Sequence, residues 1–315
     1  MFTSSTAKGI AFSFVCLVLL GVMPIVSNLR PAGIDALPFA FALSVWQVVF
    51  AAPTFATELT GRNKGIFGAR MTRAQWFRVT WATLLTGALF GISTFLYVLG
   101  VEKAGAANAA IAMQATPLFA LIFELLFLKG RKTVTELALT FVMLLALYYL
   151  GTSGTMLMTG LSPWFLLTLA VPFLWVTAHT FIKLEFAHTP ITPTQVTFFR
   201  VFISTLVLFV VLAIAYPADF AALGLDAVLQ PFAILMGLVY FLELVFWFSA
   251  IRHIDVSLAS TIDAPWPVLT MILAVFLLGD SIALYQIGAL VVVIAAIVGL
   301  TRVSVRKEKA ARVAA

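Results

Sequence analysis

Uncharged apolar stretches, each about 20 residues long, recur along almost the whole chain and constrain its fold more than any other feature. A helix of that length crosses the hydrocarbon core of a bilayer, which is about 30 Å thick. Only 10% of the 315 residues are charged and 63% are hydrophobic, whereas a soluble domain carries about 25% charged residues. The sequence therefore predicts an all-α polytopic membrane protein.

Charges, glycines and prolines divide the apolar sequence into ten predicted transmembrane helices. They occupy residues 8–28, 37–57, 77–100, 105–128, 133–152, 162–183, 194–216, 227–251, 256–278 and 282–301. No small-residue cleavage site follows the first stretch, so we expect it to be retained as a span. The helices form two halves of five, residues 1–155 and residues 156–315, and the second half ends in a short basic tail.

The two halves contain the same segment twice. YVLGVEKAGAANAAIAMQATPLF (97–119) aligns without gaps with WFSAIRHIDVSLASTIDAPWPVL (247–269). The alignment pairs Tyr97 with Trp247 and Pro117 with Pro267. Each copy contains a helix end, a charged turn, a small-residue helix start and a proline. A duplicated membrane bundle is typical of carriers, in which two similar halves rock about a site between them.

Loop charges predict that the two repeats have inverted topology. Lys and Arg concentrate in the connection 58–76, the turn 129–132 and the tail after residue 301. The connections 152–161, 217–226 and 279–281 contain neither. The positive-inside rule then places both termini in the cytoplasm. Cytoplasmic loops beside anionic lipid account for the net charge of +6, so no nucleic-acid partner is expected.

The chain resembles a known family. Two five-helix halves, a proline-containing small-residue fourth helix in each, and the ending FLLGDSIALYQIGALVVVIAAIVGL (276–300) are similar to the drug/metabolite transporter superfamily and its EamA-type repeat. The segment KGRKTVTEL (129–137) departs from the usual ending of the first repeat. The resemblance is greatest to bacterial exporters of aromatic amino acids. It implies a secondary carrier of the bacterial inner membrane that exports aromatic and other amino acids by alternating access.

Polar side chains inside predicted spans are candidates for the substrate site, because such groups are costly in lipid and usually face the bundle interior. His179 lies four residues after Trp175, so the imidazole can bind a substrate carboxylate while the indole covers a ring. Its alternative role is an interhelical hydrogen bond. Glu243, flanked by Tyr240 and Trp247, can bind a substrate ammonium group. Its alternative role is a structural pair with Arg252 or His253.

The repeat directs further residues toward the centre. Tyr97, Gln114 and Trp266 are expected to line the substrate site. Asp263 precedes Pro265 and Pro267, where a distorted helix frees backbone groups for a ligand. The favoured alternative is a first-turn carboxylate stabilised by the helix dipole.

Two other features concern coupling and gating. For Glu124, proton binding and simple packing are equally consistent with the sequence. Pro117 and Pro267 are predicted to bend their helices during gating, the alternative being a static kink.

The sequence contains no P-loop, metal cluster, HExxH or GxSxG motif, so we expect neither a cofactor nor a metal. The single cysteine, Cys16, excludes an intrachain disulfide. A carrier for another metabolite or a cationic drug is the alternative function, whereas a membrane-embedded enzyme or a scaffold is disfavoured. Proton coupling and transport down the substrate gradient both stay open, and nothing in the sequence specifies an oligomeric state.

Overall fold

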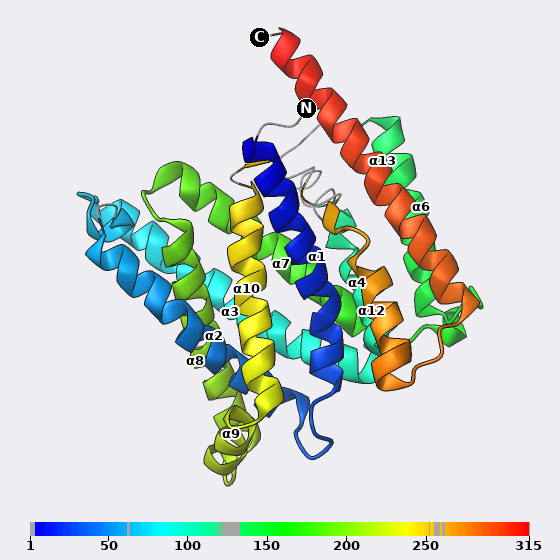
Figure 1. Cartoon of the computed structure of the whole chain (residues 1–315), viewed down its shortest axis with the longest axis horizontal. Helices are drawn as coiled ribbons and strands as arrows, with labels where there is room; N and C mark the ends of the chain where they lie inside the picture. Colours follow the sequence, from blue (N-terminus) through cyan, green and yellow to red (C-terminus); the bar gives the residue numbers. More distant parts are fainter. Residues whose placement is uncertain are drawn as a thin grey trace.

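The arrangement of the helices is given by a computed structural model (Figure 1). It describes residues 4–61, 64–116, 118–119, 122, 133–251, 253–254, 259 and 262–314. The N-terminal half contains α1 (Ser4–Asn28), α2 (Ala36–Thr60), η1 (Gly65–Phe67), α3 (Arg73–Ala104), α4 (Ala106–Met113) and α6 (Val134–Gly151). The C-terminal half contains η2 (Met158–Gly160), α7 (Pro163–His188), α8 (Pro193–Ala215), α9 (Phe220–Val228), α10 (Pro231–Ile251), α12 (Trp266–Leu273), η3 (Ala274–Leu278) and α13 (Leu284–Ala314).

The described helices fit the predicted all-helical membrane class. Seven are long and apolar enough to cross a bilayer: α1, α2, α3, α6, α7, α8 and α13. An eighth span results if α9 and α10, which meet at 69°, cross together. The fourth predicted span of each half is not among them, so the count of ten stays a prediction.

The connection after α8 differs from its predicted form. Residues 217–226 were expected to be a loop, but most of them belong to α9, which is followed by a sharp bend into α10. Pro231 is the first residue of α10. Proline has no backbone N–H and disfavours helical geometry in the residue before it. The bend therefore falls just before this proline.

The apolar segment that carries the small residues is broken at equivalent positions in the two copies. After α4, the amides of Gln114 and Ala115 donate to carbonyls three residues back, at 3.0 Å each, in place of the usual four. In the second copy, a turn at Ala264 and Pro265 precedes α12, and Gln114 is aligned with Ala264. The distortion predicted beside Asp263 is thus present. Pro267 is the second residue of α12, whereas Pro117 and Glu124 lie outside the described residues.

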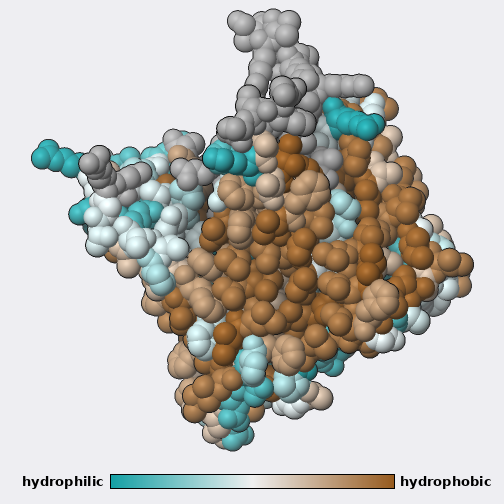
Figure 2. Space-filling view, in the orientation of Figure 1, coloured by the Kyte–Doolittle hydropathy of each residue, from teal (hydrophilic) through white to brown (hydrophobic). Residues whose placement is uncertain are grey.

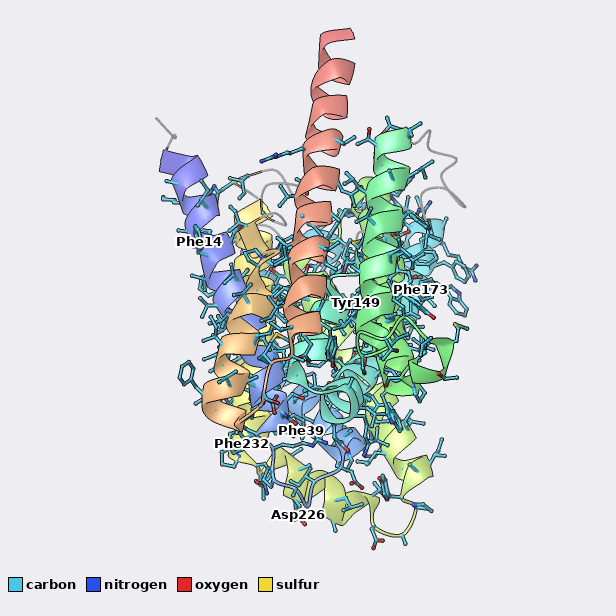
Figure 3. The ribbon with its side chains drawn as sticks, turned by 90° about the vertical axis from the view of Figure 1, so that its right-hand side faces the viewer. Phe14, Phe39, Tyr149, Phe173, Asp226 and Phe232 are labelled. Atoms are coloured by element: carbon cyan, nitrogen blue, oxygen red, sulfur yellow. The ribbon has the colours of Figure 1, made fainter. Side chains whose placement is uncertain are left out.

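The two halves interleave and do not form separate bundles. α3 packs against α7 and α8, α1 packs against α10 and α12, and α2 packs against α8 and α10. α6 and α13 contact each other, and they run side by side in opposite directions (Figures 1 and 3). Helices far apart in the sequence therefore build one shared interior.

Many large apolar side chains are exposed at the surface, as a membrane protein requires. Figure 2 shows a broad hydrophobic surface over the middle of the helices, with hydrophilic patches toward its upper and lower ends. Large exposed side chains of the spans include Phe77, Leu206 and Val291, which are 64%, 49% and 61% exposed. Such exposure is unfavourable in water and suits contact with acyl chains.

Glycines permit the closest helix crossings. A Cβ atom on Gly237 of α10 would lie 2.5 Å from Trp46 Cβ and 2.9 Å from the Leu43 carbonyl oxygen of α2. On α3, a Cβ atom on Gly87 would lie 2.6 Å from Ile203. Small residues allow backbones to approach in this way in membrane bundles.

We expect Gly237→Ala to destabilise the protein by about 1–3 kcal/mol, because α2 and α10 must separate to admit the methyl group. Gly288→Ala is the matched control, because its added Cβ meets nothing within 4 Å in α13. That change should be neutral or stabilising by about 0.5–1 kcal/mol, as glycine is unfavourable inside a helix. Thermal unfolding of both variants in detergent measures the difference, and equal melting temperatures would contradict this account of the crossing.

Candidate functional site

Polar side chains from six segments converge in the interior shared by the two halves. The six segments are the helices α1, α3, α7, α8 and α10 and the turn before α12. The residues are Cys16, Tyr97, Trp175, His179, Arg200, Tyr240, Glu243 and Asp263, which we call the central cluster. Interior polar groups in a membrane bundle indicate a substrate or ion path.

Arg200 is the cation of the central cluster. Its side chain is 6% exposed, and its guanidinium carbon lies 3.5 Å from the centroid of the Phe90 ring. His179, Tyr240 and Glu243 all lie within electrostatic range of it. The ring face and the negative charge of Glu243 compensate a cation that has been removed from water.

Arg200 is not among the site residues predicted from the sequence. It is buried in α8, seven residues after the first residue of that helix. A usable signal existed, because a charged residue inside an apolar run is itself evidence of an interior role.

Glu243 connects the cation to a second acid. It is partly buried on α10, and its carboxylate lies within electrostatic range of both Arg200 and Asp263. Its backbone carbonyl accepts a hydrogen bond from Cys16 Sγ at 3.6 Å, which brings α1 to the same place. Its predicted partner Arg252 lies outside the described residues, and exposed His253 has a ring contact with Phe12.

Asp263 is the most deeply buried acid of the central cluster. It is 5% exposed, and neither carboxylate oxygen has a hydrogen-bond partner among the described residues. A first-turn carboxylate favoured by the dipole would bond to backbone amides at its helix start. No backbone amide of the described residues donates to Asp263, so its role as a first-turn carboxylate stays an open alternative.

His179 and Trp175 lie on one face of α7, as their spacing predicts. The Trp175 indole N–H donates to Ser93 Oγ of α3 at 3.1 Å. The His179 ring centroid lies 5.3 Å from that of Phe90, yet the histidine is exposed. Phe90 and Arg200 beside it are buried, so His179 lies at the edge of the central cluster.

Two tyrosines flank the acids. Tyr97 and Tyr240 are 2% and 3% exposed and lie within electrostatic range of each other. The Tyr97 hydroxyl has no hydrogen-bond partner among the described residues. The Tyr240 hydroxyl lies beside Arg200 and Thr94. Buried hydroxyls of this kind are available to a polar ligand.

Fewer interactions connect the remaining predicted site residues to the central cluster. Trp247 is partly buried one turn beyond Glu243 on α10. Trp266, 7% exposed, begins α12, and Pro267 follows it. Gln114, 7% exposed, lies in the turn after α4, and its Nε2 atom has no partner among the described residues.

Hydrogen bonds join the two halves at both ends of the molecule. Toward one end, Thr192 donates to the Glu58 carboxylate at 2.6 Å, and Arg78 pairs with Glu185 at 3.0 Å. Toward the other, Tyr216 donates to Asp35 at 3.0 Å. Burial, together with this hydrogen bond, raises the pKa of the Tyr216 hydroxyl. In the part of the chain that the structure describes, no three His, Cys, Asp or Glu side chains form a group that could hold a metal ion.

Comparison with known proteins decides the family. The model of the EamA-like transporter family matches residues 7–152 and again residues 162–302. The chain belongs to the EamA-like transporter family. This EamA-like transporter therefore carries two EamA domains, and its family consists of membrane transporters of small solutes in the drug/metabolite transporter superfamily.

A solved structure supports the fold of this EamA-like transporter. A protein described only as "Crystal structure of protein" superposes with a TM-score of 0.55 over 94% of this chain and 98% of its own. The two sequences are 15% identical, so the similarity concerns the fold alone. The comparison with curated proteins finds no match.

Proposed function

We propose that this transporter exports amino acids, aromatic ones among them, across the bacterial inner membrane by alternating access. The observation that carries the proposal is the central cluster, in which buried charges of both signs adjoin aromatic rings. Arg200 supplies the positive charge, and Glu243 supplies the negative charge. An amino acid is a zwitterion and needs both signs at one site.

The rings fit the side chain of an aromatic substrate. His179, exposed and supported by the positive field of Arg200, binds the carboxylate, and Glu243 binds the ammonium group. The rest of the substrate is surrounded by six further side chains, those of Trp175, Tyr97, Tyr240, Trp247, Trp266 and Gln114. Offset or edge-to-face ring pairs contribute about 0.5–1.5 kcal/mol each beyond burial, which favours aromatic over small side chains.

Alternating access rests on two inverted repeats. The opposite directions of α6 and α13, the last helices of the two halves, support the inversion (Figure 1). So do the breaks at Gln114 and Ala264, which occupy equivalent positions. Bending at Pro117 and Pro267 beside these breaks would open one end while the Glu58–Thr192 or Asp35–Tyr216 contacts close the other. Broken helices at the repeat interface are typical of such carriers.

The orientation follows from the loop charges. The connection after α2 and the C-terminal end of α13 carry the basic residues and lie toward the upper side in Figure 1. Asp226 of α9 lies at the opposite end (Figure 3). With the basic end in the cytoplasm, both termini are cytoplasmic.

Proteoliposomes preloaded with labelled phenylalanine test the proposal. We expect protein-dependent efflux that unlabelled phenylalanine and other amino acids compete for. A lipophilic cation should compete weakly, since it offers no carboxylate to His179. No efflux of any amino acid would overturn the proposal, and efflux of the cation alone would favour the drug-carrier alternative.

The single cysteine provides a second readout. Cys16 is fully buried and its thiol donates to the Glu243 backbone carbonyl, so its alkylation by N-ethylmaleimide requires the interior to open, and phenylalanine held at Glu243 should change that rate. Phenylalanine that leaves the labelling rate unchanged would place the substrate elsewhere.

A further inference from the structure

The proposed binding of a zwitterion leaves one buried acid of the central cluster, Asp263, without a role. Its two carboxylate oxygens are buried and lack hydrogen-bond partners among the described residues. A buried, unpaired carboxylate is costly when ionised, on the order of several kcal/mol in a low-dielectric interior. An ionised Asp263 therefore needs a compensating cation, which can bind and dissociate during transport.

The charges that face Asp263 are few, and they can be named element by element. Glu243 of α10 and Cys16 of α1 lie within electrostatic range of Asp263. Glu243 in turn lies within range of Arg200 of α8 and Tyr240 of α10. Tyr97 of α3 and His179 of α7 lie one step further away, within range of Tyr240 and Arg200 respectively. Arg200 is balanced by Glu243, and among the described residues no permanent cation lies within electrostatic range of Asp263. With both acids ionised and His179 neutral, the central cluster carries one excess negative charge.

The position of Asp263 suits an ion rather than a structural role. It lies at the break before α12, where Pro265 and Pro267 interrupt the backbone hydrogen-bond ladder. The adjoining surface of α1 is held close: Gly21 is in contact with Leu269, and Thr270 donates to the Gly21 carbonyl at 2.8 Å. On α1, the buried Ser13 hydroxyl also lacks a hydrogen-bond partner among the residues that the structure describes. The site is thus polar, buried and next to a place where the helix can bend.

We propose that Asp263 carries one proton per transport cycle and releases it when the substrate ammonium group arrives at Glu243. The inference rests on the proposed function, because it requires a substrate that brings a positive charge. Before binding, the neutral carboxylic acid leaves Arg200 and Glu243 as the two balanced charges. The ammonium group offsets the negative charge of Glu243 beside Asp263, so the O–H bond of Asp263 breaks to leave the carboxylate, and the proton passes to water on the side from which the substrate entered.

Exchange of a proton for an amino acid gives export a driving force. The proton binds Asp263 from outside the cell when the substrate has left, and it returns inward as the carrier reorients. One pH unit corresponds to 1.36 kcal/mol, so a 1:1 exchange sustains about a tenfold substrate gradient per unit.

The test uses proteoliposomes loaded with labelled phenylalanine and a pH-sensitive dye, with the membrane potential clamped by potassium and valinomycin. An acidic exterior should accelerate wild-type efflux several-fold and raise the proton uptake that accompanies it. Asp263→Asn should lose this dependence on the pH gradient and the proton uptake. The variant should still exchange labelled for unlabelled phenylalanine, which shows that it is folded and binds substrate. Asp263→Glu, which restores the acid, should recover the coupling.

Each outcome separates the two proposals. Wild-type efflux that ignores the pH gradient and moves no protons overturns the inference and leaves the amino acid transport intact. Proton coupling that persists in Asp263→Asn assigns the proton to another group and also overturns it. Acceleration by a sodium gradient in place of a proton gradient does the same. Absence of any amino acid efflux overturns both proposals at once. Asp226→Asn, an exposed acid of α9, is the matched control and should behave like the wild type.

Discussion

Replacing Glu243 by glutamine is expected to lower the apparent affinity for phenylalanine by about 100-fold, because truncating one partner of a buried charge pair costs about 2–5 kcal/mol. Glutamine keeps the shape of the side chain and removes the negative charge that the ammonium group requires. Concentration-dependent phenylalanine efflux from proteoliposomes measures the effect. Unfolding in detergent measures stability separately.

Asp226→Asn removes an acid of the same class from an exposed position, and we expect it to transport at the wild-type rate. The comparison excludes an effect of net charge on reconstitution. Wild-type affinity in Glu243→Gln would show that the ammonium group binds elsewhere.

Replacing Arg200 by leucine should destabilise the protein by about 3 kcal/mol and abolish transport, because Glu243 is then left in the interior without its compensating cation. The double variant Arg200→Leu/Glu243→Leu removes both charges, so it should recover most of the lost stability while remaining inactive. Unfolding of the two single variants and the double variant in detergent gives the coupling energy between the two residues.

Arg70→Leu, at an exposed position in the connection before α3, is the control for this series and should leave stability unchanged. Strictly additive losses in the double variant would mean that Arg200 and Glu243 do not interact. In that case the contact of Arg200 with Phe90 would account for its role.

Several features could be predicted from the sequence because they depend on local chemistry. Runs of apolar residues are sufficient to predict membrane helices, since lipid admits only a backbone that satisfies its own hydrogen bonds. The break before α12 was predictable from Pro265 and Pro267, because proline has no backbone N–H to complete the helical hydrogen bonds. The spacing of Trp175 and His179 likewise places them on one helical face.

Other features were missed where the signal depends on partners from distant segments. In the sequence alone, the position of Arg200 does not distinguish it from other charged residues. It becomes the centre of the site only because Phe90 of α3 and Glu243 of α10 are brought against it. Cys16 was considered only as a thiol, but its contact with Glu243 places α1 at the cluster. The helix α9 was missed because its apolar run is short and precedes a proline-induced bend.

The sequence by itself determined the membrane class, the duplication and the kinds of residue available to bind a zwitterion, because hydropathy and repetition are properties of the chain alone. Only the tertiary structure decided that the halves interleave and that Glu243 lies within range of both Arg200 and Asp263. Packing in lipid depends on how closely particular backbones approach, as at Gly237 and Gly87, and so on steric fit between segments separated by more than a hundred residues.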